Sequence, residues 1–130
     1  MSSFMPYLLV GIGGFLGANA RYVVARLVGT YVDTRFPLGT FVINISGSFL
    51  LGALGTILAQ KVSPNSEAMR LALGIGFLGA FTTFSTFEFE THALIDDGSW
   101  LTATTNMVAS LLVGLVAVRV GIVLAKNWLN

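Results

Sequence analysis

The sequence of 130 residues contains no cysteine, only three prolines and few charges, with seven basic and six acidic side chains. Without cysteine, the chain has no disulfide, no thiolate metal site and no cysteine nucleophile. Charged residues make up 10% of the chain, whereas they make up about 25% of a typical soluble domain, so an ordinary soluble fold is excluded. Seven scattered cations do not form the basic patch that nucleic-acid binding requires, and we expect no nucleic-acid partner.

Apolar residues are abundant instead, at 55% of the chain, and the mean hydropathy is +0.82. They fall into four stretches, each long enough to cross a bilayer as a helix of about 20 residues. The approximate spans are 7–28, 37–60, 69–94 and 101–125. The loops between them are short, so we predict a single all-α transmembrane domain over residues 1–130, which crosses the lipid bilayer four times.

The distribution of basic residues gives the chain only a weak preferred orientation. Four spans place the N-terminus, the second loop and the C-terminus on one side, with Lys61, Arg70 and Lys126, and leave Arg26 and Arg35 on the other. The positive-inside rule needs a clear excess. Either lipids and the insertion machinery decide the orientation, or the chain inserts both ways and pairs head to tail as an antiparallel, dual-topology dimer with twofold symmetry.

Two polar residues interrupt the first two spans. Arg21 follows a face of small residues that includes Gly13 and Gly17. It either snorkels to the interface or is a buried cation that pairs with backbone carbonyls or draws anions into a vestibule. Asn44 is the only strongly polar side chain of the second span. It is either an interhelical hydrogen-bonding group or a donor that lines a pore.

The third span has the densest polar signal, with three glycines and four hydroxyl side chains in the 14 residues 74–87. Glycine before the pair Thr82-Thr83 disfavours a continuous helix, so we predict a break. Unwound backbone at membrane depth is tolerated where it lines a cavity, and its freed carbonyls can coordinate a small hard cation. Phenylalanine at 77, 81, 84 and 87 indicates one ring-lined face, either for packing or for presenting ring edges to an anion.

The fourth span carries Thr102, Asn106 and Ser110 at every fourth position, which indicates either a helix–helix contact or a track of donors for an ion. No span centre carries Asp or Glu, and the acids nearest to a span, Glu88 and Glu90, lie toward the end of the third. Because the sequence offers no acid–base pair, nucleophilic triad or metal-ligand cluster, we predict that the protein is not an enzyme.

Three segments resemble the signatures of the Fluc (CrcB-type) fluoride channels: GGFLGA at 13–18 with Arg21, GTFVIN at 39–44, and GFLGAFTTFSTF at 76–87. The resemblance covers all four spans in order. It implies an antiparallel, dual-topology homodimer that holds two fluoride pathways. Such channels release fluoride passively from the microbial cytoplasm, so the resemblance also implies a bacterial inner membrane as the location.

The resemblance also implies roles for individual residues. A structural sodium ion at the dimer centre would bind the backbone carbonyls of Gly79 and Thr82. The anion pathway would comprise the rings of Phe84 and Phe87, the asparagine Asn44, the hydroxyls of Ser85 and Thr86, the fourth-helix residues Asn106 and Ser110, the vestibule arginine Arg21, and Glu90 near the pore end.

Two alternatives remain open from the sequence. A small four-helix multidrug exporter would also be a dual-topology dimer, but that class depends on a carboxylate in its first helix, and the first span here has none. A non-transporting membrane assembly protein would leave the polar run of the third span without a role.

Overall fold

The computed structural model describes residues 2–61 and 63–130, and every regular element within them is helical. In chain order the elements are α1 (Met5–Tyr31), α2 (Leu38–Gln60), α3 (Ser66–Met69), η1 (Arg70–Leu78), α4 (Gly79–Phe81), α5 (Phe84–Asp96) and α6 (Trp100–Leu129). Four helical stretches are long and apolar enough to cross a membrane, and the third of them comprises α3 to α5. The predicted all-α fold with four spans is therefore confirmed.

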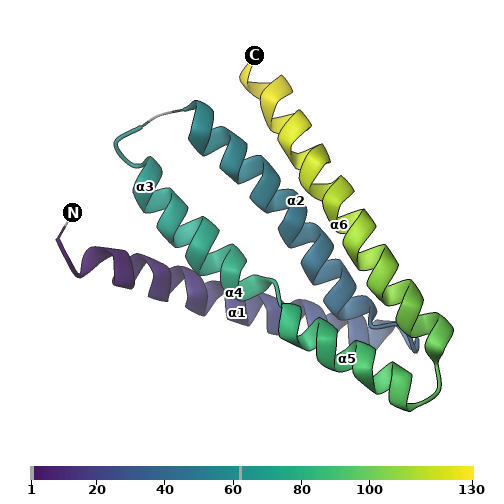
Figure 1. Cartoon of the computed structure of the whole chain (residues 1–130). Coiled ribbons are helices and arrows are strands. Elements are labelled where there is room, and N and C mark those ends of the chain that lie inside the picture. The colour runs from purple at the N-terminus through teal and green to yellow at the C-terminus, as the bar shows by residue number, and fades with distance from the viewer. Residues whose placement is uncertain (1, 62) are drawn as a thin grey trace.

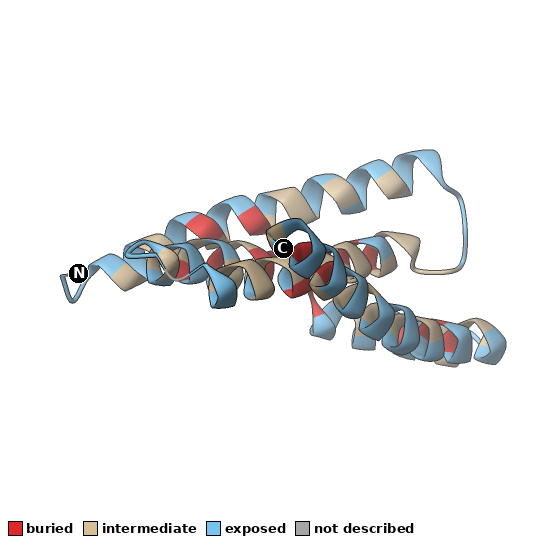
Figure 2. Cartoon of the chain, turned by 90° about the horizontal axis from the view of Figure 1, so that it is seen from above, coloured by how far each residue is buried: buried red, intermediate tan, exposed pale blue. Residues whose placement is uncertain are grey.

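The helices pack in two groups that share the broken third span (Figure 1). Helix α2 lies along α6, and η1 lies across α1, while α5 leaves the bundle and connects to the start of α6. Figure 2 shows buried residues as short patches where helices face one another, with exposed residues over most of each helix. Leucine and valine cover much of the exposed surface of α6, as expected for helices that face lipid tails.

Glycines allow the closest helix contacts. A Cβ atom on Gly13 would overlap the carbonyl oxygen of Ala72, and one on Gly17 would overlap that of Phe77, so α1 and η1 meet backbone to backbone. On the other side of the molecule, Gly121 of α6 meets the backbone of α2 in the same way. Small residues at crossing points are the usual means by which membrane helices gain packing contact.

The third span is broken at the predicted place. Thr82 (φ −78°, ψ 157°) and Thr83 (φ −150°, ψ 118°) are extended and separate α4 from α5. The segment before the break, η1, is a π-helix of nine residues, which the sequence did not predict. π-Helical turns are rare and frequently lie at functional sites.

Candidate functional site

Asn44 of α2 holds both backbone polar groups of Thr83 at the helix break. The Asn44 Nδ2 group donates to the Thr83 carbonyl at 2.9 Å, and the Thr83 N–H donates to Asn44 Oδ1 at 2.8 Å. The side-chain amide thus replaces the helical partners that the break removes. Of the two alternatives for Asn44, the hydrogen bond between helices is therefore confirmed. The amide still keeps one N–H that is not used in this pair.

The helix break also leaves backbone carbonyls without their helical donors. In a continuous α-helix the Thr83 N–H would donate to the Gly79 carbonyl, but here it donates to Asn44. Among the backbone bonds outside the helices of the described chain, none ends on the carbonyl of Gly79 or Thr82. Carbonyl oxygens of unwound membrane helices are suitable ligands for small cations.

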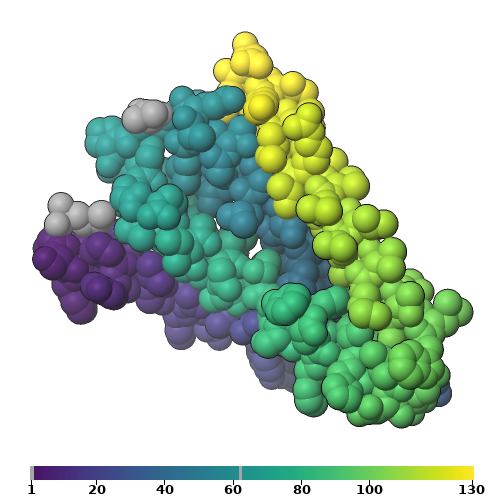
Figure 3. Space-filling model, viewed as in Figure 1, coloured from purple at the N-terminus to yellow at the C-terminus, as the bar shows by residue number. Residues whose placement is uncertain are grey.

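An open groove of about 280 Å³ lies beside the break, between α2 and the third span (Figure 3). Its lining brings together several residues of the predicted site: Asn44, Gly79, Thr82, Thr83 and Phe84, with Gly47 and Ser48 of α2. Within residues 2–61 and 63–130, no cluster of three His, Asp or Glu side chains is placed to hold a metal ion. A cation at this groove would therefore depend on backbone and hydroxyl oxygens.

Hydroxyl groups gather at the start of α5. Thr83 caps the helix, because its Oγ1 accepts the Thr86 N–H at 3.3 Å, and it donates to the Thr86 hydroxyl at 3.0 Å. The Ser85 hydroxyl lies 3.5 Å from the same oxygen. The N-terminus of a helix of 13 residues adds a partial positive charge at this point. The break therefore presents carbonyls at the end of α4 and donors at the start of α5.

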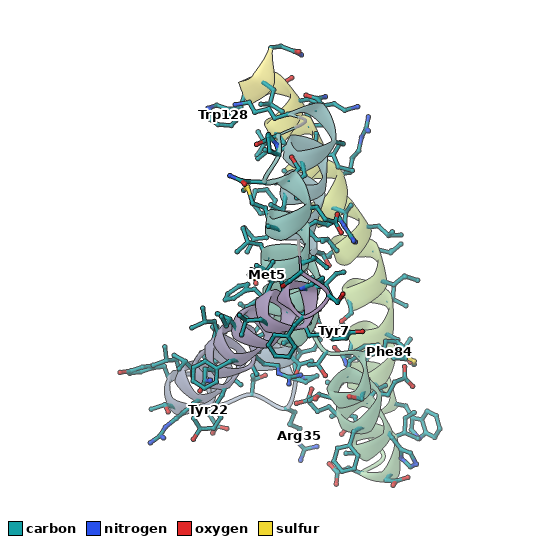
Figure 4. The ribbon with its side chains drawn as sticks, turned by 90° about the vertical axis from the view of Figure 1, so that its left-hand side faces the viewer. Met5, Tyr7, Tyr22, Arg35, Phe84 and Trp128 are labelled. Atoms are coloured by element: carbon teal, nitrogen blue, oxygen red, sulfur yellow. The ribbon has the colours of Figure 1, made fainter. Side chains whose placement is uncertain are left out.

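The four phenylalanines do not form the single face that the sequence predicted. Phe77 and Phe81 stack before the break with ring centroids 5.9 Å apart. Phe84 and Phe87 form a second, tilted pair after it, with centroids also 5.9 Å apart. The extended residues between the pairs interrupt the helical periodicity on which the prediction relied. The Phe84 ring is 74% exposed and projects from the start of α5 (Figure 4).

A chain of hydrogen bonds connects α6 to α5. The Ser110 hydroxyl donates to Asn106 Oδ1 at 3.2 Å, Asn106 Nδ2 donates to Thr91 Oγ1 at 2.8 Å, and Thr91 Oγ1 donates to the Phe87 carbonyl at 2.7 Å. The structure thus brings Asn106 and Ser110 together, as a polar track requires. Sequence reasoning missed Thr91; its only signal was a hydroxyl four positions after Phe87, on the same helix face.

Arg21 and Glu90 lie apart from the groove. Arg21 is partly buried on α1, and it makes no hydrogen bond or ion pair within the described part of the chain. Glu90 borders a cavity of about 220 Å³ that also includes Gly39 and Thr40 at the start of α2. Its Oε2 atom is buried and has no hydrogen-bond partner among the described residues. A buried acceptor of this kind is usually paired, so its donor is expected outside the described residues, for example in water or a second molecule.

Together these features define a class: a multi-pass membrane protein whose third span is broken and presents backbone carbonyls and hydroxyl groups at the break. Residues 8–122 match the family described as CrcB-like protein, Camphor Resistance (CrcB), and the chain belongs to this family.

Curated relatives cover nearly the whole chain. A protein of Solibacter usitatus is 42% identical over 123 residues, which are 95% of this chain and 100% of the relative. One of Acidobacterium capsulatum is 47% identical over 95% of this chain and 98% of the relative. Both are named fluoride-specific ion channel FluC. Their names describe ion channels and not enzymes, which confirms the prediction that the protein is not an enzyme.

Proposed function

We propose that the protein is a fluoride-selective channel through which fluoride leaves the cytoplasm passively, across the inner membrane of a bacterium. The observation that carries the proposal is the helix break at Thr82-Thr83, held open by Asn44. Fluoride is a small, strongly hydrated hydrogen-bond acceptor. A selective pathway replaces its water with several moderate donors and must also let it leave, and amide, hydroxyl and ring-edge groups meet both needs.

The proposed pathway uses groups on both sides of the break. The free N–H of Asn44, the hydroxyls of Ser85 and Thr86, and the positive edges of the Phe84 and Phe87 rings replace water around the ion. Asn106 and Ser110 continue the track on α6. Arg21 attracts anions to a vestibule, where a full charge does not trap the ion in the narrowest part. Glu90 lies near one pore end.

The proposed active form is an antiparallel, dual-topology homodimer with two pores at its interface. In a single chain the groove is open and Phe84 is exposed, so one chain does not enclose a pathway. A second copy would cover the groove and the ring. The near balance of cations on the two sides allows insertion in both orientations.

Sodium completes the proposal as a structural ion at the dimer centre. The carbonyls of Gly79 and Thr82 fit this role because their usual helical donors, the N–H groups of Thr83 and Thr86, donate to side chains instead. Two carbonyls from one chain are too few to surround a cation, and twofold symmetry doubles the number of oxygens. The ion would hold the two breaks against each other.

Fluoride efflux from liposomes that contain the purified protein tests the function. We expect rapid fluoride release at a fluoride electrode, no chloride release in parallel, and no dependence on an imposed proton gradient. Proton-coupled release would favour the exporter, which is not supported by the channel names of the relatives or by the first helix without a carboxylate. No release from folded dimers would contradict the channel proposal.

A further inference from the structure

We infer that Thr91 is a positioning residue of the ion pathway, which orients the Asn106 amide and so controls whether the Ser110 hydroxyl can donate to a passing anion. The inference rests on the proposed function. The three side chains connect α5 to α6 through consecutive hydrogen bonds. Asn106 is 1% exposed and Thr91 is 5% exposed, so water does not compete for these groups.

In the structure, the direction of these hydrogen bonds follows from the Asn106 Nδ2 group, which faces Thr91. Thr91 has one hydroxyl proton, and a carbonyl can only accept, so this proton is given to the Phe87 carbonyl at 2.7 Å. The Thr91 oxygen can then only accept, and it receives Asn106 Nδ2 at 2.8 Å. The other end of the amide, Oδ1, therefore faces Ser110 and takes its proton at 3.2 Å. In this arrangement the Ser110 hydroxyl has no proton left for an anion.

Rotation of the Asn106 amide by half a turn reverses the whole chain. Nδ2 then donates to the Ser110 oxygen, and Oδ1 accepts the proton of Thr91, which leaves the Phe87 carbonyl to its helical bond. The Ser110 hydroxyl keeps its proton but no longer donates it to Asn106, so the O–H group can point into the pathway. The heavy atoms hardly move, because the oxygen and nitrogen of an amide are nearly the same size. Thr91 is needed in both arrangements, first as an acceptor and then as a donor.

A bound anion would favour the reversed arrangement. Fluoride next to Ser110 attracts the hydroxyl proton. When the ion leaves, the Asn106 amide rotates back and Ser110 again donates to Asn106. Conduction requires binding that is strong enough for the ion to enter and weak enough for it to leave. A donor that is present only while the ion is present satisfies both conditions. Apolar Val in place of Thr91 would bond neither amide end and would remove this response.

The test compares fluoride efflux from liposomes for Thr91→Val, Thr91→Ser, Ser110→Ala and the double variant Thr91→Val/Ser110→Ala. We expect Thr91→Val to lose roughly tenfold in flux, the equivalent of about one hydrogen bond, and Thr91→Ser to retain it. Because Thr91 acts through Ser110, the double variant should be no slower than Ser110→Ala alone. Thr56→Val is the matched control. Thr56 also donates to a carbonyl four residues earlier, at 2.8 Å, but it lies on α2 and takes no part in the hydrogen bonds between α5 and α6.

Each outcome decides the inference. Wild-type flux in Thr91→Val, or effects of Thr91→Val and Ser110→Ala that multiply, would overturn it, because a residue that only stabilises the fold acts independently of Ser110. Thr91→Ala replaces Thr91→Val, with the same expectations, if the valine variant does not elute as a folded dimer. Absence of fluoride release from the wild type would overturn the proposed function, and the inference with it. If the wild type releases fluoride, the proposed function stands, and the flux of the variants decides the inference alone.

Discussion

The side chain of Asn44 bonds both backbone polar groups of Thr83, which gives Asn44 a structural role beside the one proposed for it in the ion pathway. Replacing it removes the partners of the Thr83 N–H and carbonyl, and each buried polar group left without a partner costs about 1–3 kcal/mol. We predict that Asn44→Ala lowers the unfolding temperature and reduces fluoride flux roughly tenfold or more. Asn19→Ala is the control, because Asn19 bonds only its own helix, at the carbonyl of Phe15. A folded Asn44→Ala variant with wild-type flux would make the residue purely structural.

The proposed role of the Phe84 ring can be tested against Phe89, which lies five positions later and is a matched control. Phe84 and Phe89 both lie on α5 and are 74% and 77% exposed, but only Phe84 borders the groove at the break. Phe84→Ile keeps the apolar bulk and removes the positive ring edge, so fluoride flux should fall roughly tenfold while the dimer persists in size-exclusion chromatography. Phe89→Ile should transport as the wild type does. Equal flux in both variants would remove the ring from the pathway.

Single residues differ in how far the sequence could predict them. Asn44 was expected to bond another helix or line a pore, because a lone amide in an apolar span must find a partner. Its partner at Thr83 was not predictable, since that contact depends on how α2 meets the break. Thr91 was missed for the same reason: its role arises from the rotation of α5 against α6, which no spacing within one helix reveals.

The contact between α1 and η1 depends on glycine at two positions. A Cβ on Gly17 would overlap the carbonyl of Phe77, whereas a Cβ on Gly11 of the same helix would meet nothing within 4 Å. We predict that Gly17→Ala destabilises the fold by roughly 1–3 kcal/mol through overpacking, and that Gly11→Ala does not. Thermal unfolding in detergent measures both. A Gly17→Ala variant as stable as Gly11→Ala would show that the two helices separate at little cost.

The four spans and the break were predictable, but the form of the third span was not. Span number follows from length and hydropathy, and the break follows from glycine before Thr82-Thr83. The π-helical form of η1 occurs where this segment packs closely against α1, and no residue spacing within the segment predicts it. The expectation of one phenylalanine face failed because it carried helical periodicity across two extended residues.

The two ends of the molecule carry opposite charge. One end has three basic residues and one acid, namely Lys61, Arg70, Lys126 and Glu67. The other end has three acids and two bases, namely Asp33, Asp96, Asp97, Arg26 and Arg35. Trp128, whose ring lies 4.6 Å from the Lys61 ammonium, and Arg35 lie at opposite ends in Figure 4. An antiparallel pair places unlike ends side by side, which is a modest, salt-screened preference over a parallel pair.

Basic residues are nearly balanced between the two sides, three against two, and this makes the proposed dual topology testable by a few added charges. Gln60→Lys/Asn65→Lys adds cations at one end, and Asp33→Lys/Thr34→Lys adds them at the other, so each pair of changes should fix one orientation by the positive-inside rule. Chains that all insert the same way lack an antiparallel partner, so we predict that either variant alone loses fluoride efflux from cells, and that co-expression of the two restores it.

Acidic residues contribute little to orientation, so Gln60→Glu/Asn65→Glu is the matched control and should remain active alone. Labelling of single cysteines introduced into the loops from outside the cell measures the orientation directly. Antiparallel pairing predicts both results: each lysine variant labels in one orientation and loses efflux when expressed alone. Full efflux from a variant that labels in one orientation only would mean that parallel chains conduct. That result would overturn the antiparallel dimer but not the proposed fluoride transport.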